Sequence, residues 1–265
     1  MKMILLVGFG AMGKFVYEHL KGHPLVDRWL VLERGARRDA VQACLDPRDL
    51  AVSSLQEIEG ELEFAVECAG HEAVRTVVPE LLGQGVNTII ASVGALADAK
   101  LAAALDAACS SGRSQLTLVP GALAGVDALS ASRIFGLDTV SYCGRKPPCS
   151  WKGTPAEEMC DLDTLVEAAT FFRGSARQAA STFPQNANVA AMVGLAGLGL
   201  DLTRVELVAD PHATGNTHTI SAQGNFGSLE MRIAATPFAA NPKTSALAGM
   251  SVIRTVQNQL SHFVI

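Results

Sequence analysis

The chain begins with a run of apolar residues that ends in a glycine-rich turn, "VGFGAMG". Its glycines, Gly8, Gly10 and Gly13, have the G-x-G-x-x-G spacing, and the turn stands between a strand-like run and a helical pattern. In that context Gly8 permits a tight turn, Gly10 lets the backbone approach a pyrophosphate, and Gly13 lets the helix pack closely on the strand. The pattern predicts a dinucleotide site formed by these glycines with Ala11 and Met12. A tight turn that binds no ligand is the alternative.

Apolar runs alternate with helical patterns through the first 120 residues. The runs are "KMILLVG", "RWLVLE", "EFAVECAG", "NTIIASVGA" and "QLTLVPGA", and the helical patterns are "AMGKFVYEHLKG", "HEAVRTVVPELLGQG" and "DAKLAAALDAACSSG". Continuous apolar strands that alternate with amphipathic helices indicate a parallel sheet covered on both faces. We therefore expect residues 1–120 to form an α/β dinucleotide-binding domain.

The pattern of predicted strands and helices changes after residue 120. "LDTVSYCGRK", "RVELVADP", "THTISAQG" and "SLEMRIAATPF" predict strands, and "QGNFG" predicts the hairpin connection between the last two. We expect helices near 160–171 and 187–198, so that 121–241 forms a second, smaller α+β domain of mixed sheet for substrate binding, catalysis and dimerisation. "NPKTS" predicts the start of a helix over 242–260, which we expect to pack back on the first domain.

Composition excludes several classes of protein. The net charge is −5 and the chain has no block of like charges, so neither nucleic acid nor a membrane surface is expected as a partner. The longest apolar stretch, "ANVAAMVGLAGLGL", is too short to span a bilayer. The six cysteines are scattered without ligand spacing, which predicts reduced thiols and no metal site. We expect a soluble, cytoplasmic protein.

An acidic residue follows the glycine turn at the distance expected for a ribose contact. Glu33 ends the run "WLVLE", twenty residues beyond Gly13, where a carboxylate accepts hydrogen bonds from both ribose hydroxyls and favours NAD. Arg34, Arg37 and Arg38 follow, and a guanidinium can pair with the 2′-phosphate of NADP. We therefore predict an NAD site that also accepts NADP. An exposed loop face is the other interpretation of the arginines.

Small residues stand where two later strands end, in "ECAGH" and "SVGA". Ligands of open α/β sheets bind outside the carboxyl ends of the strands, so small residues there leave room for a cofactor. We predict cofactor contacts at Cys68, Ala69, Gly70 and Gly94, with His71 as a further candidate. Ordinary strand-to-helix turn chemistry explains the same residues without a ligand.

Taken in order, "ECAGH", "SVGAL", "PGALAGVDALSA", "GRKPP", "FPQNANVAA", "ADPHATGNTHTI" and "NPKTSAL" resemble the motifs of the L-aspartate dehydrogenases. The resemblance covers essentially the full length. It implies a homodimer with an N-terminal Rossmann domain and a C-terminal α/β domain. It also implies the interconversion of L-aspartate with oxaloacetate and ammonia, through iminoaspartate, with NAD or NADP. Some members of the family supply NAD biosynthesis.

The resemblance implies roles for individual residues. The family's catalytic histidine matches His218 in "NTHTI", and its cofactor contacts match Ala124 in "GALAGVDAL" and Asn188 in "QNANVAA". Because "GALAG" departs from the small-residue order of relatives, Ala122 rivals Ala124. Asn188 also opens a predicted helix, where an N-cap role is the alternative. The variable loop "DPHATGN" carries nothing over onto His212.

The residues of "THTISAQG" fit the implied proton transfer. Period-two alternation places His218 at the head of an otherwise apolar strand face, beside a loop, and an imidazole titrates near neutrality. A hydrogen-bonded core histidine has the same signature. Dehydrogenases of other aspartate-pathway metabolites, such as homoserine dehydrogenase or dihydrodipicolinate reductase relatives, and an NAD-binding sensor without turnover are the rival functions.

A dicarboxylate substrate needs cations or helix N-termini. Arg145 and Lys146 follow a predicted strand, and a planar guanidinium matches a carboxylate. Lys243 and Thr244 stand at the predicted start of the last helix, where backbone N–H groups favour anions. We predict Arg145, Lys243 and Thr244 as substrate-binding residues, with surface charges and capping hydroxyls as the alternative.

Overall fold

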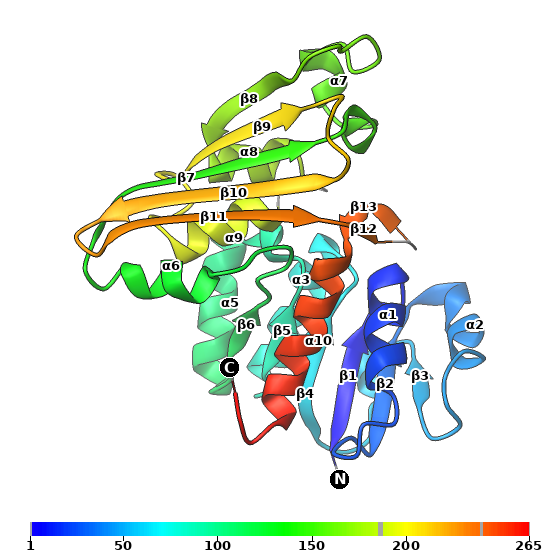
Figure 1. Cartoon of the computed structure of the whole chain (residues 1–265). Helices are drawn as coiled ribbons and strands as arrows, with labels where there is room; N and C mark the ends of the chain where they lie inside the picture. The colour runs from blue at the N-terminus through cyan, green and yellow to red at the C-terminus, as the bar shows by residue number, and fades with distance from the viewer. Residues whose placement is uncertain (1, 185–187, 239–240, 265) are drawn as a thin grey trace. The chain divides into compact units, whose positions relative to one another are not determined.

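The computed structural model describes residues 2–184, 188–238 and 241–264, with the side chains of 237, 238 and 241–244 outside that description. Two compact units divide the chain (Figure 1). One comprises residues 1–119 and 249–265, and the other comprises 120–248. The predicted fold class, a parallel N-terminal sheet with a smaller domain of mixed sheet, is confirmed.

A six-stranded parallel sheet forms the centre of the first unit. Its strand order is β3-β2-β1-β4-β5-β6, the order of doubly wound dinucleotide-binding sheets. The strands are β1 (Met3–Val7), β2 (Arg28–Leu32), β3 (Leu50–Val52), β4 (Leu62–Glu67), β5 (Thr88–Ile90) and β6 (Leu116–Leu118). The helices are α1 (Ala11–Leu20), α2 (Arg38–Gln42), α3 (His71–Thr76), α4 (Val78–Gly83), α5 (Ala99–Gly112) and, from the end of the chain, α10 (Ala246–Leu260), with short helices η1 (Gly35–Arg37), η2 (Leu55–Glu57) and η3 (Val93–Ala97).

Alternate residues of β1 enter two different hydrophobic cores. Ile4 and Leu6 pack with residues of α1 and α10 on one face of the sheet. Leu5 and Val7 pack with residues around α4 on the other face. Every residue of β1 is therefore buried, which explains why its sequence is a continuous apolar run and not an alternating one.

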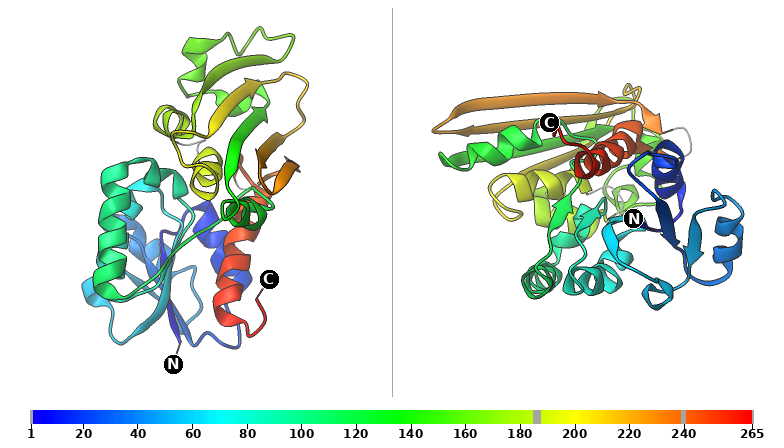
Figure 2. Two further views of the ribbon diagram at one scale, coloured as in Figure 1. Left: turned by 90° about the vertical axis from the view of Figure 1, so that its left-hand side faces the viewer. Right: turned by 90° about the horizontal axis from the view of Figure 1, so that it is seen from below.

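The last helix belongs to the core of the first unit, where α10 lies beside α1 in Figures 1 and 2. Val252, Val256 and Leu260 enter the same core as Ile4. At Gly249 a Cβ would lie 2.8 Å from the Phe15 ring, so the glycine permits the close approach of the two helices.

This helix begins at Ala246, four residues after the predicted start at 242. Residues 241–245 instead form a strand, β13 (Asn241–Ser245), which pairs with β12 (Pro237–Phe238). The capping residue is Ser245, whose Oγ accepts a hydrogen bond from the Leu247 N–H at 3.1 Å. Pairing with a neighbouring strand has overridden the Asn-Pro signal for a helix start.

The helix expected over "HEAVRTVVPELLGQG" is also wrong in detail, because α3 and α4 divide it at Val77. Pro79 lies in the first turn of α4. Proline lacks the N–H that would continue α3, and its ring clashes with the carbonyl oxygen four residues earlier. The chain therefore ends one helix and begins another.

The second unit is built on a five-stranded mixed sheet of order β11-β10-β7-β9-β8. Only β7 and β9 are parallel, and the other pairs are antiparallel. Its strands are β7 (Leu137–Lys146), β8 (Ala169–Ser175), β9 (Arg204–Ala209), β10 (Asn216–Gly224) and β11 (Gly227–Ala235), and its helices are α6 (Val126–Ser132), η4 (Pro148–Trp151), α7 (Ala156–Met159), α8 (Ala176–Thr182) and α9 (Asn188–Ala196). The predicted hairpin at "QGNFG" connects β10 and β11 through Gly224 and Gly227.

The helix predicted near 160–171 is wrong. Within 160–175 the structure has β8, which pairs with β9, and α7 ends before it at Met159. Phe171 and Phe172 pack with Phe183, and Phe171 also packs on Trp151. Two adjacent aromatic residues after a threonine favour a strand, and the aromatic cluster stabilises it.

No helix in the described part of the chain is long and apolar enough to cross a membrane. All six cysteines lie among the described residues, and each is a free thiol.

A buried hydrogen-bond network joins α1 to β2 and β3. The Tyr17 hydroxyl, fully buried, donates to Asp49 Oδ2 at 2.7 Å and accepts from the Asp46 N–H at 2.7 Å. The backbone N–H of Trp29 donates to the other oxygen of the Asp49 carboxylate, Oδ1, at 2.9 Å. Removing the hydroxyl would leave a buried carboxylate oxygen and an N–H without this partner.

Tyr17→Phe is therefore expected to lower the free energy of unfolding by about 1–3 kcal/mol, as measured by urea denaturation. Lys14→Ala, on the exposed face of the same helix, is the matched control and is expected to change it by less than about 0.5 kcal/mol. Equal stability of both variants would show that the network contributes nothing.

Candidate functional site

The strand order of the first unit reverses between β1 and β4, since the chain builds outward from β1 through β2 and β3 and then from β4 through β5 and β6. At such a switch point the loops beyond the carboxyl ends of the strands diverge and leave room for a ligand. The glycine turn follows β1, and Cys68, Ala69 and Gly70 follow β4. The fold thus brings these two predicted groups of residues to one edge of the sheet.

Two of the three motif glycines are required by the fold. Gly8 has φ +88°, and a Cβ there would lie 2.5 Å from the Ala69 Cβ. A Cβ at Gly13 would lie 2.1 Å from the Gly8 carbonyl oxygen. Both contacts are too short for any side chain, so the turn, the helix and the β4 loop approach one another through bare backbone.

Gly10 differs from both, because a Cβ there would meet no described atom within 4 Å. It is the N-cap residue of α1, and none of the described side chains caps this helix. The N–H groups of the first turn, at Ala11, Met12 and Gly13, have no earlier helical carbonyl to bond. Open space before a helix N-terminus fits a pyrophosphate, which the helix dipole also attracts.

Glu33 is tied to the glycine turn. Its Oε2 accepts a hydrogen bond from the Phe9 N–H at 3.0 Å, and its Oε1 lies 3.6 Å from Arg37 Nη1. Arg37 also donates to the Phe9 carbonyl oxygen at 3.3 Å. The carboxylate, with 13% of its side chain exposed, therefore stands at the turn in the position of a ribose contact.

The other two arginines of this loop differ in their surroundings. Arg38 Nε donates to the Ala51 carbonyl oxygen at 3.2 Å, which anchors it to β3. Arg34 is exposed, and its guanidinium bonds to none of the described residues. Of the three arginines predicted as 2′-phosphate ligands, Arg34 is the one not engaged elsewhere in the described structure.

Glu67, which the sequence analysis did not select, organises the loops after β4 and β5. Its fully buried carboxylate accepts hydrogen bonds from the Ala69 and Gly70 N–H groups at 2.8 and 2.6 Å. It also accepts from the N–H and hydroxyl of Ser92 at 3.0 and 2.9 Å. A glutamate that ends an apolar strand was the available signal, because a buried carboxylate needs several donors.

Three further residues predicted to contact the cofactor lie in the segments that follow β4 and β5. Cys68 is half-buried, and burial, with the nearby Glu67 carboxylate, raises the pKa of its thiol well above the usual range. His71 is the first residue of α3, and Gly94 is buried in η3. Cofactor contacts at Gly94 and His71 stay predictions.

In the second unit, His218 and Tyr142 form a buried pair. The Tyr142 Oη and His218 Nδ1 atoms are 2.8 Å apart and hydrogen-bonded, and the two side chains are both about 3% exposed. Along β10, Asn216, His218, Ile220 and Ala222 are buried while the residues between them are partly exposed, which is the predicted alternation. Burial raises the pKa of the Tyr142 hydroxyl, so this partner stays protonated.

A glycine makes the Tyr142–His218 contact possible. His218 pairs with Gly144 of β7 across the sheet, and Tyr142 is two residues away on the same face. A Cβ at Gly144 would lie 2.6 Å from the Tyr142 hydroxyl oxygen. The missing side chain therefore leaves the space through which the phenol reaches the imidazole.

Lys146 completes this row on β7. Val140, Tyr142, Gly144 and Lys146 are buried, and Lys146 is only 5% exposed. Burial lowers the pKa of Lys146 to about 8. Burial and then the charge of Lys146 lower the pKa of His218 to about 3, so the imidazole is neutral at ordinary pH.

Arg145 faces the other side of the sheet. Its Nη1 donates to Asp210 Oδ2 at 2.8 Å, and the same carboxylate accepts from the His212 N–H. These bonds lower the pKa of Asp210, the Arg145 bond most. Arg145, Asp210 and His212 help to line a pocket of about 380 Å³ before β10. The structure does not bring Arg145 to the face of His218.

The remaining predicted residues are scattered. Ala124 is exposed just before α6, whereas its rival Ala122 is buried. Asn188 is the first residue of α9. Lys243 and Thr244 lie in β13 instead of at a helix N-terminus, and their side chains are outside the described residues.

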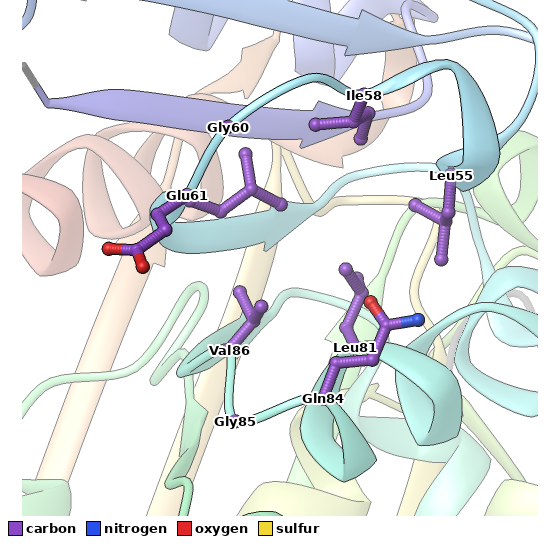
Figure 3. A pocket seen from close by; sticks show the side chains of 9 residues that line it. Leu55, Ile58, Gly60, Glu61, Leu81, Gln84, Gly85 and Val86 are labelled. Carbon is purple, nitrogen blue, oxygen red and sulfur yellow. The ribbon is translucent and has the colours of Figure 1, made fainter.

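A pocket of about 390 Å³ in the first unit lies away from the glycine turn (Figure 3). Leu55, Ile58, Leu81 and Val86 line it, on segments that precede β4 and β5. This is the amino-terminal edge of the parallel strands, opposite the edge where ligands of such sheets bind. We assign it no part in cofactor binding.

Both halves of the chain are similar to known proteins. Residues 127–259 match the family model "Aspartate dehydrogenase, C-terminal", and residues 8–118 match "Homoserine dehydrogenase, NAD binding domain". An L-aspartate dehydrogenase of Cupriavidus necator is 47% identical over 97% of each chain, and one of Polaromonas sp. is 44% identical over 98% of each. The crystal structure of an aspartate dehydrogenase from Thermotoga maritima covers 100% of this chain and 99% of its own, with a TM-score of 0.81 and 26% identity.

Gly10→Ala separates ligand binding from folding. Because its Cβ meets no described protein atom within 4 Å, the free energy of unfolding of the variant is expected to lie within about 1 kcal/mol of the wild-type value. The methyl group intrudes on the space before the helix, so NADH is expected to bind at least about tenfold more weakly in a fluorescence titration, a loss of ~1.4 kcal/mol.

Gly83→Ala is the matched control, since a Cβ there also meets no described atom within 4 Å and Gly83 is the last residue of α4, outside the glycine turn. Wild-type NADH affinity in Gly10→Ala would show that the turn does not hold the cofactor. Gly13→Ala is expected instead to destabilise the fold by about 1–3 kcal/mol or more.

Proposed function

The chain belongs to the aspartate dehydrogenase family, and we propose from that membership that it interconverts L-aspartate with oxaloacetate and ammonia through iminoaspartate, using NAD. The single observation that carries the proton chemistry is the buried Tyr142–His218 pair. The residues of the glycine turn fit a dinucleotide, because open space at Gly10 precedes an uncapped helix N-terminus. NAD held at this turn would supply the acceptor for the hydride that leaves Cα of aspartate.

His218 is the general acid and base in this proposal. When Nδ1 carries the proton and donates it to Tyr142 Oη, the lone pair of Nε2 is available to a substrate or a water. The neutral imidazole takes a proton from the water that adds to the imine, and it returns a proton to the departing amine. Tyr142 acts as a positioning residue, since its hydrogen bond to Nδ1 fixes the direction of the ring.

Substrate binding must raise the pKa of His218 for the imidazole to act as a base. Burial and the positive charge of Lys146 lower this pKa in the free protein. A dianionic substrate brings negative charge to this face, which offsets the repulsion from Lys146 and favours the imidazolium. The imidazole is thus neutral before binding and a stronger base in the complex.

For the cofactor we propose NAD, with NADP also accepted. The Glu33 carboxylate at the glycine turn suits the two ribose hydroxyls and repels a 2′-phosphate. The exposed Arg34 supplies a cation that a 2′-phosphate can reach. Contacts of the cofactor with Ala124 and Asn188, the homodimer and the cytoplasmic location stay predictions that follow from the family.

Homoserine is the rival substrate. The NAD-binding half matches a model described for homoserine dehydrogenase, but the half that holds His218 matches the aspartate dehydrogenase model. Substrate specificity depends on the site and not on the shared cofactor domain. The C-terminal match therefore favours aspartate.

Oxidation of NADH by the purified protein, followed by absorbance, is expected with oxaloacetate and to require ammonium. His218→Ala is expected to lower kcat by about 10²- to 10⁴-fold, the range for loss of a general acid–base group, without changing NADH affinity. His212→Ala, in the exposed loop before β10, is the control and is expected to keep wild-type turnover.

Turnover without ammonium would indicate a hydroxy-acid dehydrogenase. NADH binding with no turnover on any dicarboxylate would support a sensor. Either result contradicts the proposed reaction.

Glu33→Gln tests the cofactor preference. The amide oxygen can still accept from the Phe9 N–H, so the turn is kept while the negative charge is lost. The ratio of NADPH to NADH affinity is expected to rise about tenfold, since repulsion of a 2′-phosphate by ~1.4 kcal/mol is removed. Arg34→Ala is expected to move the same ratio in the opposite direction. An unchanged ratio in both variants would exclude this loop as the determinant.

A further inference from the structure

A second charged group lies on the same sheet face as His218. On β7 the residues Tyr142, Gly144 and Lys146 alternate onto the buried face, and His218 of β10 stands opposite Gly144. Lys146 is therefore two residues from the position that pairs with His218. Its charge also acts on the imidazole, which places the two groups within electrostatic reach of each other.

Aromatic surface holds the Lys146 amine. Its Nζ atom lies 4.8 Å from the centroid of the Trp151 ring, which is itself fully buried. The Trp151 indole N–H donates to the Val208 carbonyl oxygen at 3.1 Å, so β9 fixes the ring under the lysine. A cation–π contact offsets part of the cost of burying an ammonium, which lysine ordinarily avoids by reaching solvent.

The neighbouring cation, Arg145, forms a salt bridge on the other side of the sheet. Arg145 points to the opposite face and is engaged by Asp210. Sequence alone ranked the guanidinium first, because it matches a carboxylate well. Of these two adjacent cations, only Lys146 shares a face with His218.

We propose that Lys146 is a substrate-binding residue of the His218 site, whose buried ammonium binds one carboxylate of the dicarboxylate substrate. This rests on the proposed function, which supplies a dianionic substrate. A carboxylate brought to a buried ammonium forms a charge-assisted hydrogen bond in a region of low dielectric, where such bonds are strongest. The same contact offsets the positive charge that adds to burial in lowering the pKa of His218.

The ammonium form is the one that binds. With its pKa lowered to about 8, Lys146 is charged in about nine molecules in ten at pH 7 and loses the proton as pH rises through 8. Among the described residues of this sheet face, the other titratable groups are Tyr142 and His218. Ala209, opposite Lys146 on β9, and Trp151 of η4 carry no titratable group. Substrate affinity is therefore expected to fall above about pH 8.

Lys146→Met tests the proposal, since it removes the charge and keeps an unbranched apolar chain that a buried site tolerates. The KM for oxaloacetate, measured with ammonium and NADH, is expected to rise by about 10- to 100-fold, as for loss of one hydrogen bond to a charged group. The KM for NADH is expected to stay within about twofold. The KM for oxaloacetate in the variant is also expected to lose its rise between pH 7 and 9.

Lys152→Met is the matched control, because Lys152 is an exposed lysine that pairs with Asp163. It is expected to leave both KM values unchanged. The dissociation constant of succinate, an unreactive dicarboxylate, measured calorimetrically in the presence of NADH, gives a readout independent of turnover and is expected to rise in Lys146→Met alone.

The outcomes separate this proposal from the proposed function. A wild-type protein that does not turn over oxaloacetate with ammonium overturns both. Wild-type turnover with an unchanged KM for oxaloacetate in Lys146→Met overturns the role of Lys146 alone. An equal loss of oxaloacetate and NADH affinity in Lys146→Met assigns Lys146 a structural role and overturns the proposal. So does loss of the near-UV circular-dichroism signal, which reports fixed side-chain packing.

Discussion

Close backbone approach is the constraint on which the first unit depends. Gly8 faces Ala69 and Gly13 faces the Gly8 carbonyl, at distances where any Cβ would clash. These contacts set how near α1 and the β4 loop come to β1 at the switch point of the sheet. At Gly10, by contrast, a Cβ would meet no described atom within 4 Å, so an anion can approach the N–H groups of the first turn of α1.

A missing side chain has the same effect in the second unit. Gly144 lies between Tyr142 and Lys146 on β7 and opposite His218 on β10. The phenol crosses the space that a Cβ would fill and fixes the imidazole from a buried position. A neutral histidine, a protonated phenol and a buried ammonium then form one row on a sheet face. Burial shifts the pKa of all three groups, and the charge of Lys146 further lowers the pKa of His218.

Buried carboxylates keep the loops of the first unit in place. Glu67 gathers four donors from two loops, and Asp49 joins α1 to β2. Each is an acidic residue without solvent, so each is stable only because several N–H or O–H groups converge on it. Rigid loops beyond the strand ends are what a cofactor site requires, since ordering them on binding would cost affinity.

Local periodicity determined much of this protein. The glycine spacing, the continuous apolar runs and the alternation along β10 are patterns visible within a few residues of sequence, so the parallel sheet and the buried face of His218 were predictable. Boundaries failed where a distant partner decided them: β8 formed by pairing with β9, and β13 replaced the first turn of a predicted helix. Only tertiary structure showed that Glu67 joins two loops and that Lys146 shares the face of His218 while Arg145 does not. The pairing of His218 with Gly144 joins strands 74 positions apart, and sequence patterns carry no information on register over such a separation.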